Sequence, residues 1–178
     1  MEVSVPQKRF DGVFARPFAA VCFLLLAGGS AAETGTGASA PATRIAKVVY
    51  HADFGDPRRF SALLTSIRNM VATYEAELRE YDVRVVFIAS GIRFVTEDKL
   101  LKTPFAEDEA LRKRRRDLLE RLISLRDVYG VKLELCGITR EQARLPESKL
   151  IAGVTVVPSG VVRLAELQQQ GFAYIKVE

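Results

Sequence analysis

The chain has 178 residues, 48% of them hydrophobic, and its 26 lysine and arginine residues against 22 aspartate and glutamate residues give a net charge of +4. This mild basic excess does not indicate nucleic-acid binding. With one histidine, two cysteines and no cofactor motif, the sequence predicts neither a metal site nor a bound cofactor.

Residues 1–32 have the pattern of a secretory signal peptide. Three basic residues come first, residues 18–27 form an apolar run too short to span a membrane, and small residues occupy positions 30–32. We expect cleavage before Glu33, a periplasmic protein, and no stable membrane insertion afterwards. The alternative is an uncleaved leader that anchors the chain in the membrane.

Residues 33–43 are small and polar and predict a flexible linker, so the globular domain is expected at 44–178. A domain of about 135 residues buries enough surface to fold without disulfides or a metal. Cleavage would remove Cys22 and leave Cys136 as the only cysteine. In an oxidising compartment an odd cysteine is buried, paired between chains, or a free reactive thiol.

The first predicted elements of the domain are a strand at 45–51 and a long helix. Asp56-Pro57 has the pattern of an N-cap followed by proline in the first turn. Apolar residues then recur at three- and four-residue spacing, which is typical of one buried helix face. These residues are Phe60, Leu63, Leu64, Ile67, Met70, Val71 and Tyr74.

The second predicted strand, at 83–89, is apolar on both faces and therefore central in a sheet. Residues 90–103 fit either a short helix or a continuation of this strand. Thr103-Pro104 predicts the start of a helix that runs to about Tyr129, where Gly130 ends it. Its predicted inward residues are Leu111, Leu118, Leu122, Leu125 and Val128.

The last third of the domain predicts a strand at 131–135, a strand at 154–157, a helix at 161–170 and a final strand at 172–177. Thr139 and Gln142 have the spacing of a capping box, which predicts a short helix from Arg140. Because strands and helices alternate, we expect an α/β fold with a mostly parallel central sheet of about five strands and helices on both faces.

Cys136 follows the third strand and precedes a helix start. In a parallel sheet, ligands gather at the carboxyl ends of strands, and a helix N-terminus favours the thiolate form of cysteine. Cys136 is therefore a candidate reactive thiol. The alternative is a small buried residue without chemistry, as free cysteine often is.

Three other features are candidates for a functional role. His51 ends the first strand, so it is expected at the same edge as Cys136, as a base or as a structural imidazole. Asn69 is a polar residue between core positions of the first helix. The basic run at 111–117 is interpreted as a solvated helix face stabilised by pairs with acidic residues four positions away, and alternatively as a partner surface.

With these residues placed, the sequence over about 45–178 resembles the DsrE/DsrF-like family, and within it the exported single-domain members related to YchN. The resemblance depends on "VVYH" followed by Gly55-Asp56, on Asn69, on Cys136-Gly137-x-Thr139, and on the tail from Gly153 to Glu178. It implies a sheet flanked by helices, assembly into a homotrimer or hexamer, and a cysteine that carries persulfide sulfur between proteins. Ile138 stands where related exported proteins tend to have asparagine.

The leading hypothesis is an exported sulfur-carrier or sulfur-relay protein, sulfurtransferase-like if it is an enzyme. Cys136 would accept the sulfur, and His51, Asn69, Gly137 and Thr139 would line the site. The expected partners are further copies of the chain and the proteins that donate and accept sulfur. One alternative is a non-catalytic oligomeric binding module, and another is a small-molecule enzyme that uses His51 without the thiol.

Overall fold

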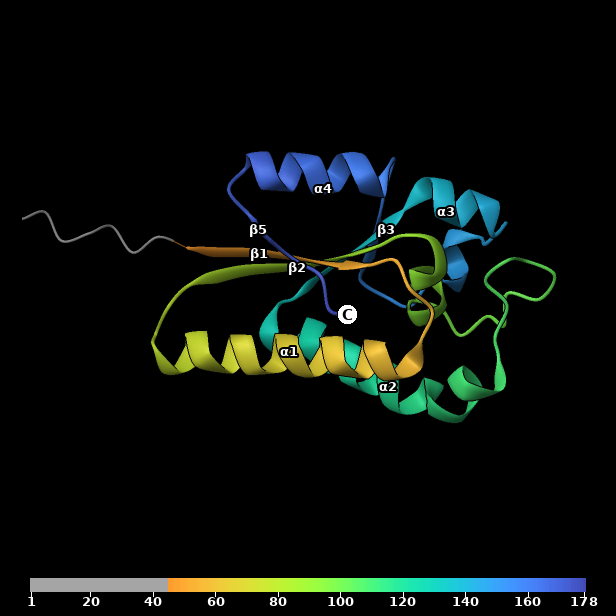
Figure 1. Ribbon diagram of the computed structural model, residues 1–178, viewed down its shortest axis with the longest axis horizontal. Coiled ribbons are helices and arrows are strands. Elements are labelled where there is room, and N and C mark those ends of the chain that lie inside the picture. Colours follow the sequence, from red (N-terminus) through yellow and green to blue (C-terminus); the bar gives the residue numbers. More distant parts are fainter. Residues whose placement is uncertain (1–44) are drawn as a thin grey trace, which may run out of the picture. The chain divides into compact units, whose positions relative to one another are not determined.

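The computed structural model describes residues 45–178, in which five parallel strands form one sheet with helices on both faces (Figure 1). The strand order is β4-β3-β2-β1-β5. The strands are β1 (Ala46–Ala52), β2 (Tyr81–Phe87), β3 (Lys132–Cys136), β4 (Val154–Val157) and β5 (Ala173–Ile175). The expected α/β fold is confirmed, whereas the predicted signal peptide at 1–32 and linker at 33–43 lie outside the described residues.

Four α-helices and two short 3-10 helices connect the strands. They are α1 (Pro57–Ala76), η1 (Ala89–Phe94), α2 (Glu109–Tyr129), α3 (Gly137–Gln142), η2 (Glu147–Lys149) and α4 (Gly160–Gln169). None of these helices is long and apolar enough to cross a membrane. Of the two alternatives for residues 90–103, the short helix is correct for 90–94, which lie in η1, while 95–103 form turns and an isolated bridge between Thr96 and Leu150.

The start of α1 matches the prediction. One carboxylate oxygen of Asp56 accepts hydrogen bonds from the backbone N–H groups of Arg58, at 2.7 Å, and Arg59, at 2.8 Å. These bonds satisfy donors that have no partner within the helix, and Pro57 has no such donor to satisfy. The cap therefore fixes where the chain turns from the carboxyl end of β1 into the helix.

The prediction for the start of α2 was wrong. The helix begins at Glu109, because Asp108 is the N-cap and its carboxylate accepts from the backbone N–H of Leu111 at 2.8 Å. The Thr103 hydroxyl instead closes a local turn, accepting from the N–H of Phe105 at 3.1 Å. Val128 was also wrongly expected inside, since its side chain is 67% exposed near the end of the helix. Gly130 ends α2 as expected, with a left-handed φ of 64°.

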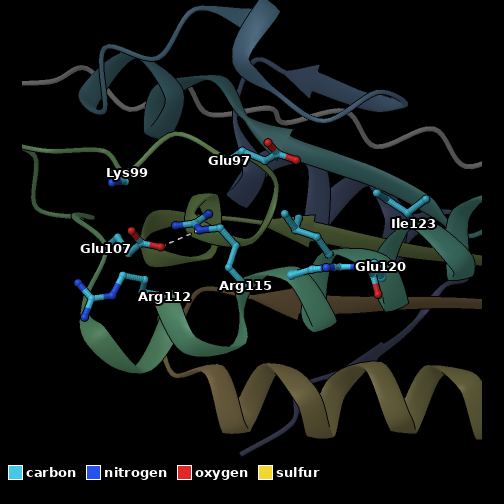
Figure 2. A pocket seen from close by; sticks show the side chains of 9 residues that line it. Glu97, Lys99, Glu107, Arg112, Arg115, Glu120 and Ile123 are labelled. Carbon is cyan, nitrogen blue, oxygen red and sulfur yellow. Dashed lines mark hydrogen bonds and ion pairs between the residues drawn. The ribbon is translucent and has the colours of Figure 1, made fainter.

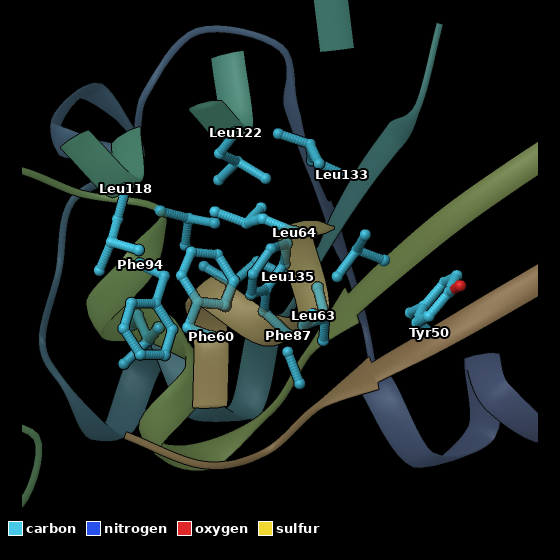
Figure 3. Packing of buried hydrophobic residues seen from close by; sticks show 14 of the residues in the cluster. Tyr50, Phe60, Leu63, Leu64, Phe87, Phe94, Leu118, Leu122, Leu133 and Leu135 are labelled. Carbon is cyan, nitrogen blue, oxygen red and sulfur yellow. The ribbon is translucent and has the colours of Figure 1, made fainter. Parts of the chain in front are cut away.

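The sheet has two faces with different cores. Successive side chains of a strand point to opposite faces. One face packs against α1 and α2 in the larger cluster, which includes Phe60, Leu63, Phe87 and Leu135 (Figure 3). The other face packs against α4 in a smaller cluster of Val49, Val86, Leu164, Leu167 and Phe172. Because Leu133 and Leu135 of β3 lie in the larger cluster, the intervening Glu134 and the following Cys136 face α4.

The junction between β3 and α3 also differs from the prediction. Helix α3 begins at Gly137 rather than at Arg140, and Cys136 itself occupies the N-cap position. Thr139 does not act as the N-cap, because its hydroxyl oxygen accepts from the backbone N–H of Ala89 at 3.0 Å. The thiol is therefore carried by the residue that joins the strand to the helix.

Candidate functional site

Cys136 lies where the start of α4 meets the start of α3. Its side chain is 4% exposed. Burial raises the pKa of the Cys136 thiol, but hydrogen bonding outweighs burial and leaves the pKa below its usual value. The groups that lower the pKa are the nearby backbone N–H groups of Gly160, Thr139 and Ile138, together with the hydroxyl of Thr139. The sulfur thus faces a set of donors that stabilises its negatively charged form.

Gly160 allows the first turn of α4 to approach the thiol. A Cβ atom at this position would lie 2.6 Å and 2.8 Å from two side-chain carbons of Ile88 and 3.0 Å from the Cβ of Cys136. Real Cβ atoms essentially never approach other atoms this closely, so a larger residue would displace the Ile88 side chain or the start of α4. Gly137 is packed similarly, since its Cβ would lie 3.0 Å from the carbonyl oxygen of Val157.

Thr139 links the thiol to the end of β2. Its side chain is buried, and its oxygen already accepts from the backbone N–H of Ala89. The same hydroxyl contributes to the lowered pKa of Cys136. Ala89 has a φ of 48°, a left-handed conformation that non-glycine residues seldom adopt. The strained residue is held beside the candidate site, a location where such strain is commonly found.

His51 is not brought into contact with Cys136 in one chain. The two residues face the same side of the sheet, but β2 lies between their strands and the register places His51 level with Glu134, so the backbones of His51 and Cys136 are about 12 Å apart. His51 Nδ1 is 2.8 Å from the Tyr174 hydroxyl, and Nε2 is 3.9 Å from a carboxylate oxygen of Asp53. Burial lowers the pKa of His51, and the attraction of Asp53 only partly offsets this. The His51 imidazole therefore interacts with Tyr174 and Asp53 rather than with Cys136.

Asn69 lies away from the thiol. It is exposed on α1, the helix that covers the opposite face of the sheet from α4 (Figure 1). Its backbone oxygen accepts from the Thr73 hydroxyl at 3.0 Å. Of the residues predicted to line the site, the structure therefore brings Gly137 and Thr139 to Cys136, and places His51 and Asn69 elsewhere in the same chain.

The basic run on α2 forms helix-stabilising ion pairs. Lys113 pairs with Glu109 at 2.8 Å, and Arg116 pairs with Glu120 at 2.7 Å, both at the expected spacing of four residues. The predicted pair of Asp108 with Arg112 is absent from the described ion pairs, since Asp108 binds Arg93 at 2.6 Å. Lys113 and Arg116 thus have the solvated arrangement that was predicted for the run, whereas Arg115 is buried and binds Glu107 and the backbone carbonyls of Arg93 and Thr96.

Two hollows are relevant to the choice of a site. A cavity of about 630 Å³ lies along α2, where Arg115 pairs with Glu107 at 2.8 Å (Figure 2). This cavity has no cysteine, serine, threonine or histidine among its lining residues. A smaller one of about 290 Å³ lies at the start of α4 and is lined in part by Val157 and Ser159. Val157 pairs with Cys136 across the sheet, so this hollow adjoins the thiol.

The group that sets the chemistry of this site is the single cysteine of the described residues. Residues 45–178 contain no group of three or more histidine, cysteine, aspartate or glutamate side chains placed to hold a metal ion. Cys136 is a free, buried cysteine. A thiol with a lowered pKa and several backbone donors can attack a sulfur or carbon electrophile and stabilise the product anion.

Sequence reasoning missed Gly160 and Glu134. The "PSG" turn after the fourth predicted strand places a helix start at the carboxyl end of β4, next to β3, and this was the available signal for Gly160. Glu134 could have been noticed as a charged residue inside an apolar strand. Its side chain is buried on the face of the sheet to which Cys136 also points, and it accepts hydrogen bonds from Arg163 and Arg84.

The fold and the site define a small parallel α/β domain with one buried free thiol at the carboxyl edge of its sheet. The sequence pattern of the DsrE/DsrF-like family matches residues 43–177, and the chain belongs to this family. No curated protein was found to match the chain.

Solved structures similar to this chain include the following two. A protein of unknown function, MTH1491 from Methanobacterium thermoautotrophicum, is 26% identical with a TM-score of 0.56, and the match covers 74% of this chain and 98% of that one. The ychN protein from E. coli is 22% identical with a TM-score of 0.47, covering 74% of this chain and 99% of that one. The first of these supports the α/β fold described above.

Proposed function

We propose that this protein is an exported sulfur carrier that accepts persulfide sulfur on Cys136. Membership of the DsrE/DsrF-like family supports a role in sulfur relay, with which this family is associated. The observation that carries the proposal is the set of donors around the thiol, from the first turns of α3 and α4 and from Thr139, which lowers the pKa of Cys136 despite its burial. Because the thiolate is the nucleophilic form, these donors favour attack at neutral pH.

The transfer step needs no cofactor. The Cys136 thiolate attacks the terminal sulfur of a donor persulfide, forming a new bond between its Sγ and that sulfur. The sulfur–sulfur bond of the donor breaks, and its electron pair leaves with the donor thiolate. The number of persulfides is unchanged, so no oxidant or reductant is consumed. An acceptor thiolate removes the terminal sulfur from Cys136 by the same reaction in the other direction.

The surroundings of Cys136 suit delivery by a partner protein. The sulfur is buried, but Ile138 beside it is 51% exposed and Val161 at the start of α4 is 67% exposed. Apolar side chains left in solvent around a nucleophile favour docking by a protein surface. Ile138 contributes to this surface at the position where related exported proteins tend to have asparagine.

Two further parts of the proposal concern the location and assembly of the protein. The pattern of residues 1–32 supports export to the periplasm, and N-terminal sequencing of the native protein should give a start near Glu33. An intact Met1 terminus in the native host would argue for another location. The family resemblance supports a homotrimer or a hexamer, in which a neighbouring subunit could complete the surface around the thiol.

The second candidate is a non-catalytic oligomeric binding module. The 4% exposure of Cys136 favours it, because a structural cysteine is shielded in this way. The two candidates differ in the reactivity of the thiol. Iodoacetamide should label Cys136 of the native protein if it is a carrier, whereas a structural thiol should react only after denaturant is added.

The direct test is loading with a small persulfide donor such as glutathione persulfide. We expect the peptide that contains Cys136 to gain about 32 Da, the mass of one sulfur atom, and to lose it on treatment with dithiothreitol. Cys136→Ser is the matched control and should gain no sulfur at this peptide. Absence of the adduct from the native protein, when the same donor loads a control thiol, would refute the carrier function.

A further inference from the structure

A buried ion pair joins α4 to β3 close to the thiol. The Arg163 guanidinium donates to both carboxylate oxygens of Glu134, through Nε at 2.6 Å and through Nη2 at 2.9 Å. The side chain of Glu134 is 6% exposed and that of Arg163 is 22% exposed. A two-pronged contact of this kind fixes the relative orientation of the two groups as well as their distance.

The position of this pair in the sequence connects it to the site. Glu134 and Cys136 are two residues apart on β3 and face the same side of the sheet. Arg163 follows Gly160 by three residues, so the two lie on the same side of α4, one turn apart. The ion pair therefore holds the first turn of α4, where Gly160 lies so close to the thiol residue that a Cβ atom on it would be 3.0 Å from the Cβ of Cys136.

The pair is anchored within the sheet by a second arginine. Arg84 of β2 donates to Glu134 at 2.8 Å and to Asp82 at 2.8 Å, and Lys132 also binds Asp82. Burial raises the pKa of Glu134, but Arg163 and Arg84 outweigh burial and hold the pKa below its usual range. Glu134 is thus charged at neutral pH and has fixed partners on both sides.

We propose that Glu134 and Arg163 are positioning residues that aim the N–H of Gly160 at the Cys136 sulfur. The inference rests on the proposed function, since it assigns them a task toward the reactive thiol. Gly160 removes the steric barrier to close approach, and the ion pair supplies the attachment that keeps α4 in place. Neither residue touches the transferred sulfur.

A positioning role and a through-space charge effect make opposite predictions. Glu134→Gln removes a negative charge near the thiol, which by electrostatics alone would lower the pKa of Cys136. Loss of the fixed contact to α4 would instead weaken a hydrogen bond to the thiolate and raise the pKa. We expect a rise of about 1 unit, a tenfold fall in the thiolate fraction at pH values well below the pKa.

A second variant separates geometry from charge. Arg163→Lys keeps the positive charge but cannot make the two-pronged contact. We expect the pKa of Cys136 to rise in this variant as well, whereas a pure charge effect predicts no change. Glu107→Gln is the matched control, because Glu107 also forms a buried pair with an arginine, Arg115, on the opposite face of the sheet (Figure 2). It should leave the pKa of Cys136 unchanged.

The measurement is the pH dependence of iodoacetamide labelling on the full chain, read by mass spectrometry at the Cys136 peptide, with circular dichroism to confirm folding. If Glu134→Gln does not fold, Arg163→Lys decides the question. A low pKa in the unaltered protein that persists in the folded variants would overturn the positioning role and leave the carrier function standing. A thiol that is unreactive in the unaltered protein would overturn both.

Discussion

Gly160→Ala is a direct test of how the helix start activates the thiol. The added Cβ would lie 2.6 Å and 2.8 Å from side-chain carbons of Ile88. Carbon atoms in contact are normally about 3.5 to 4.0 Å apart, so α4 or Ile88 must move by about 1 Å. A shift of α4 by this amount takes the Gly160 N–H out of good hydrogen-bonding geometry with the sulfur.

The expected result is a higher pKa for Cys136. Burial, which raises the pKa, would remain, while the Gly160 donor, which lowers it, would be lost or weakened. One hydrogen bond to a charged group contributes about 1.5 kcal/mol, which corresponds to a rise of about 1 unit. Overpacking should also cost about 1 to 3 kcal/mol of folding stability.

The assay is the pH dependence of alkylation at Cys136, together with thermal unfolding. Gly130→Ala is a suitable control, because Gly130 ends α2 with a left-handed φ of 64° and a Cβ there would meet nothing within 4 Å. This control should cost about 1 to 2 kcal/mol through backbone strain and leave the thiol pKa unchanged. A folded Gly160→Ala variant with an unaltered pKa would refute the assigned role of the α4 N-terminus.

Three further predictions follow from the same structure. Burial lowers the pKa of His51 from its usual 6.5, so as the pH falls the unfolded chain takes up the proton before the folded chain does. The free energy of unfolding should therefore be highest above about pH 6.5 and fall as the pH drops toward the folded-state pKa. His51→Gln should remove this part of the pH dependence of chemical unfolding. Asn69→Ala should leave alkylation at Cys136 unchanged if only one subunit forms the site, and a raised thiol pKa would show that Asn69 reaches it from a neighbouring subunit. Light scattering after size-exclusion chromatography should give a trimer or a multiple of it, and a monomer at micromolar concentration would contradict the assembly proposed from the family.

The fold was predictable from the sequence because its signals are local and periodic. Apolar residues at helical spacing placed α1, and the Asp56-Pro57 pair placed its first turn. The five strands follow from short apolar runs separated by helices, an alternation that gives parallel sheets. The start of α2 was predicted wrongly because two residues, Thr103 and Asp108, can both serve as an N-cap. Thr103-Pro104 had a suitable pattern, but the carboxylate of Asp108 captured the helix start five residues later.

The site was only partly predictable, because its determinants lie between elements. The position of Cys136 at a strand end, and its neighbours Gly137 and Thr139, are matters of sequence spacing. The separation of His51 from Cys136 depends on strand order, which places β2 between them. The role of Gly160 depends on the distance between α4 and Ile88, and no spacing within the chain specifies that distance.

The same reasoning explains why the thiol can be both buried and activated. Burial alone would keep Cys136 neutral and inert. The structure opposes that tendency with donors drawn from α3 and α4, while Thr139 is held in place by the N–H of the strained Ala89. Each donor lies on α3 or at the start of α4, and packing against the sheet fixes the position of these helices. A change that loosens α4 should therefore affect the chemistry of Cys136 before it affects the fold, which is why Gly160, Glu134 and Arg163 are the informative positions to vary.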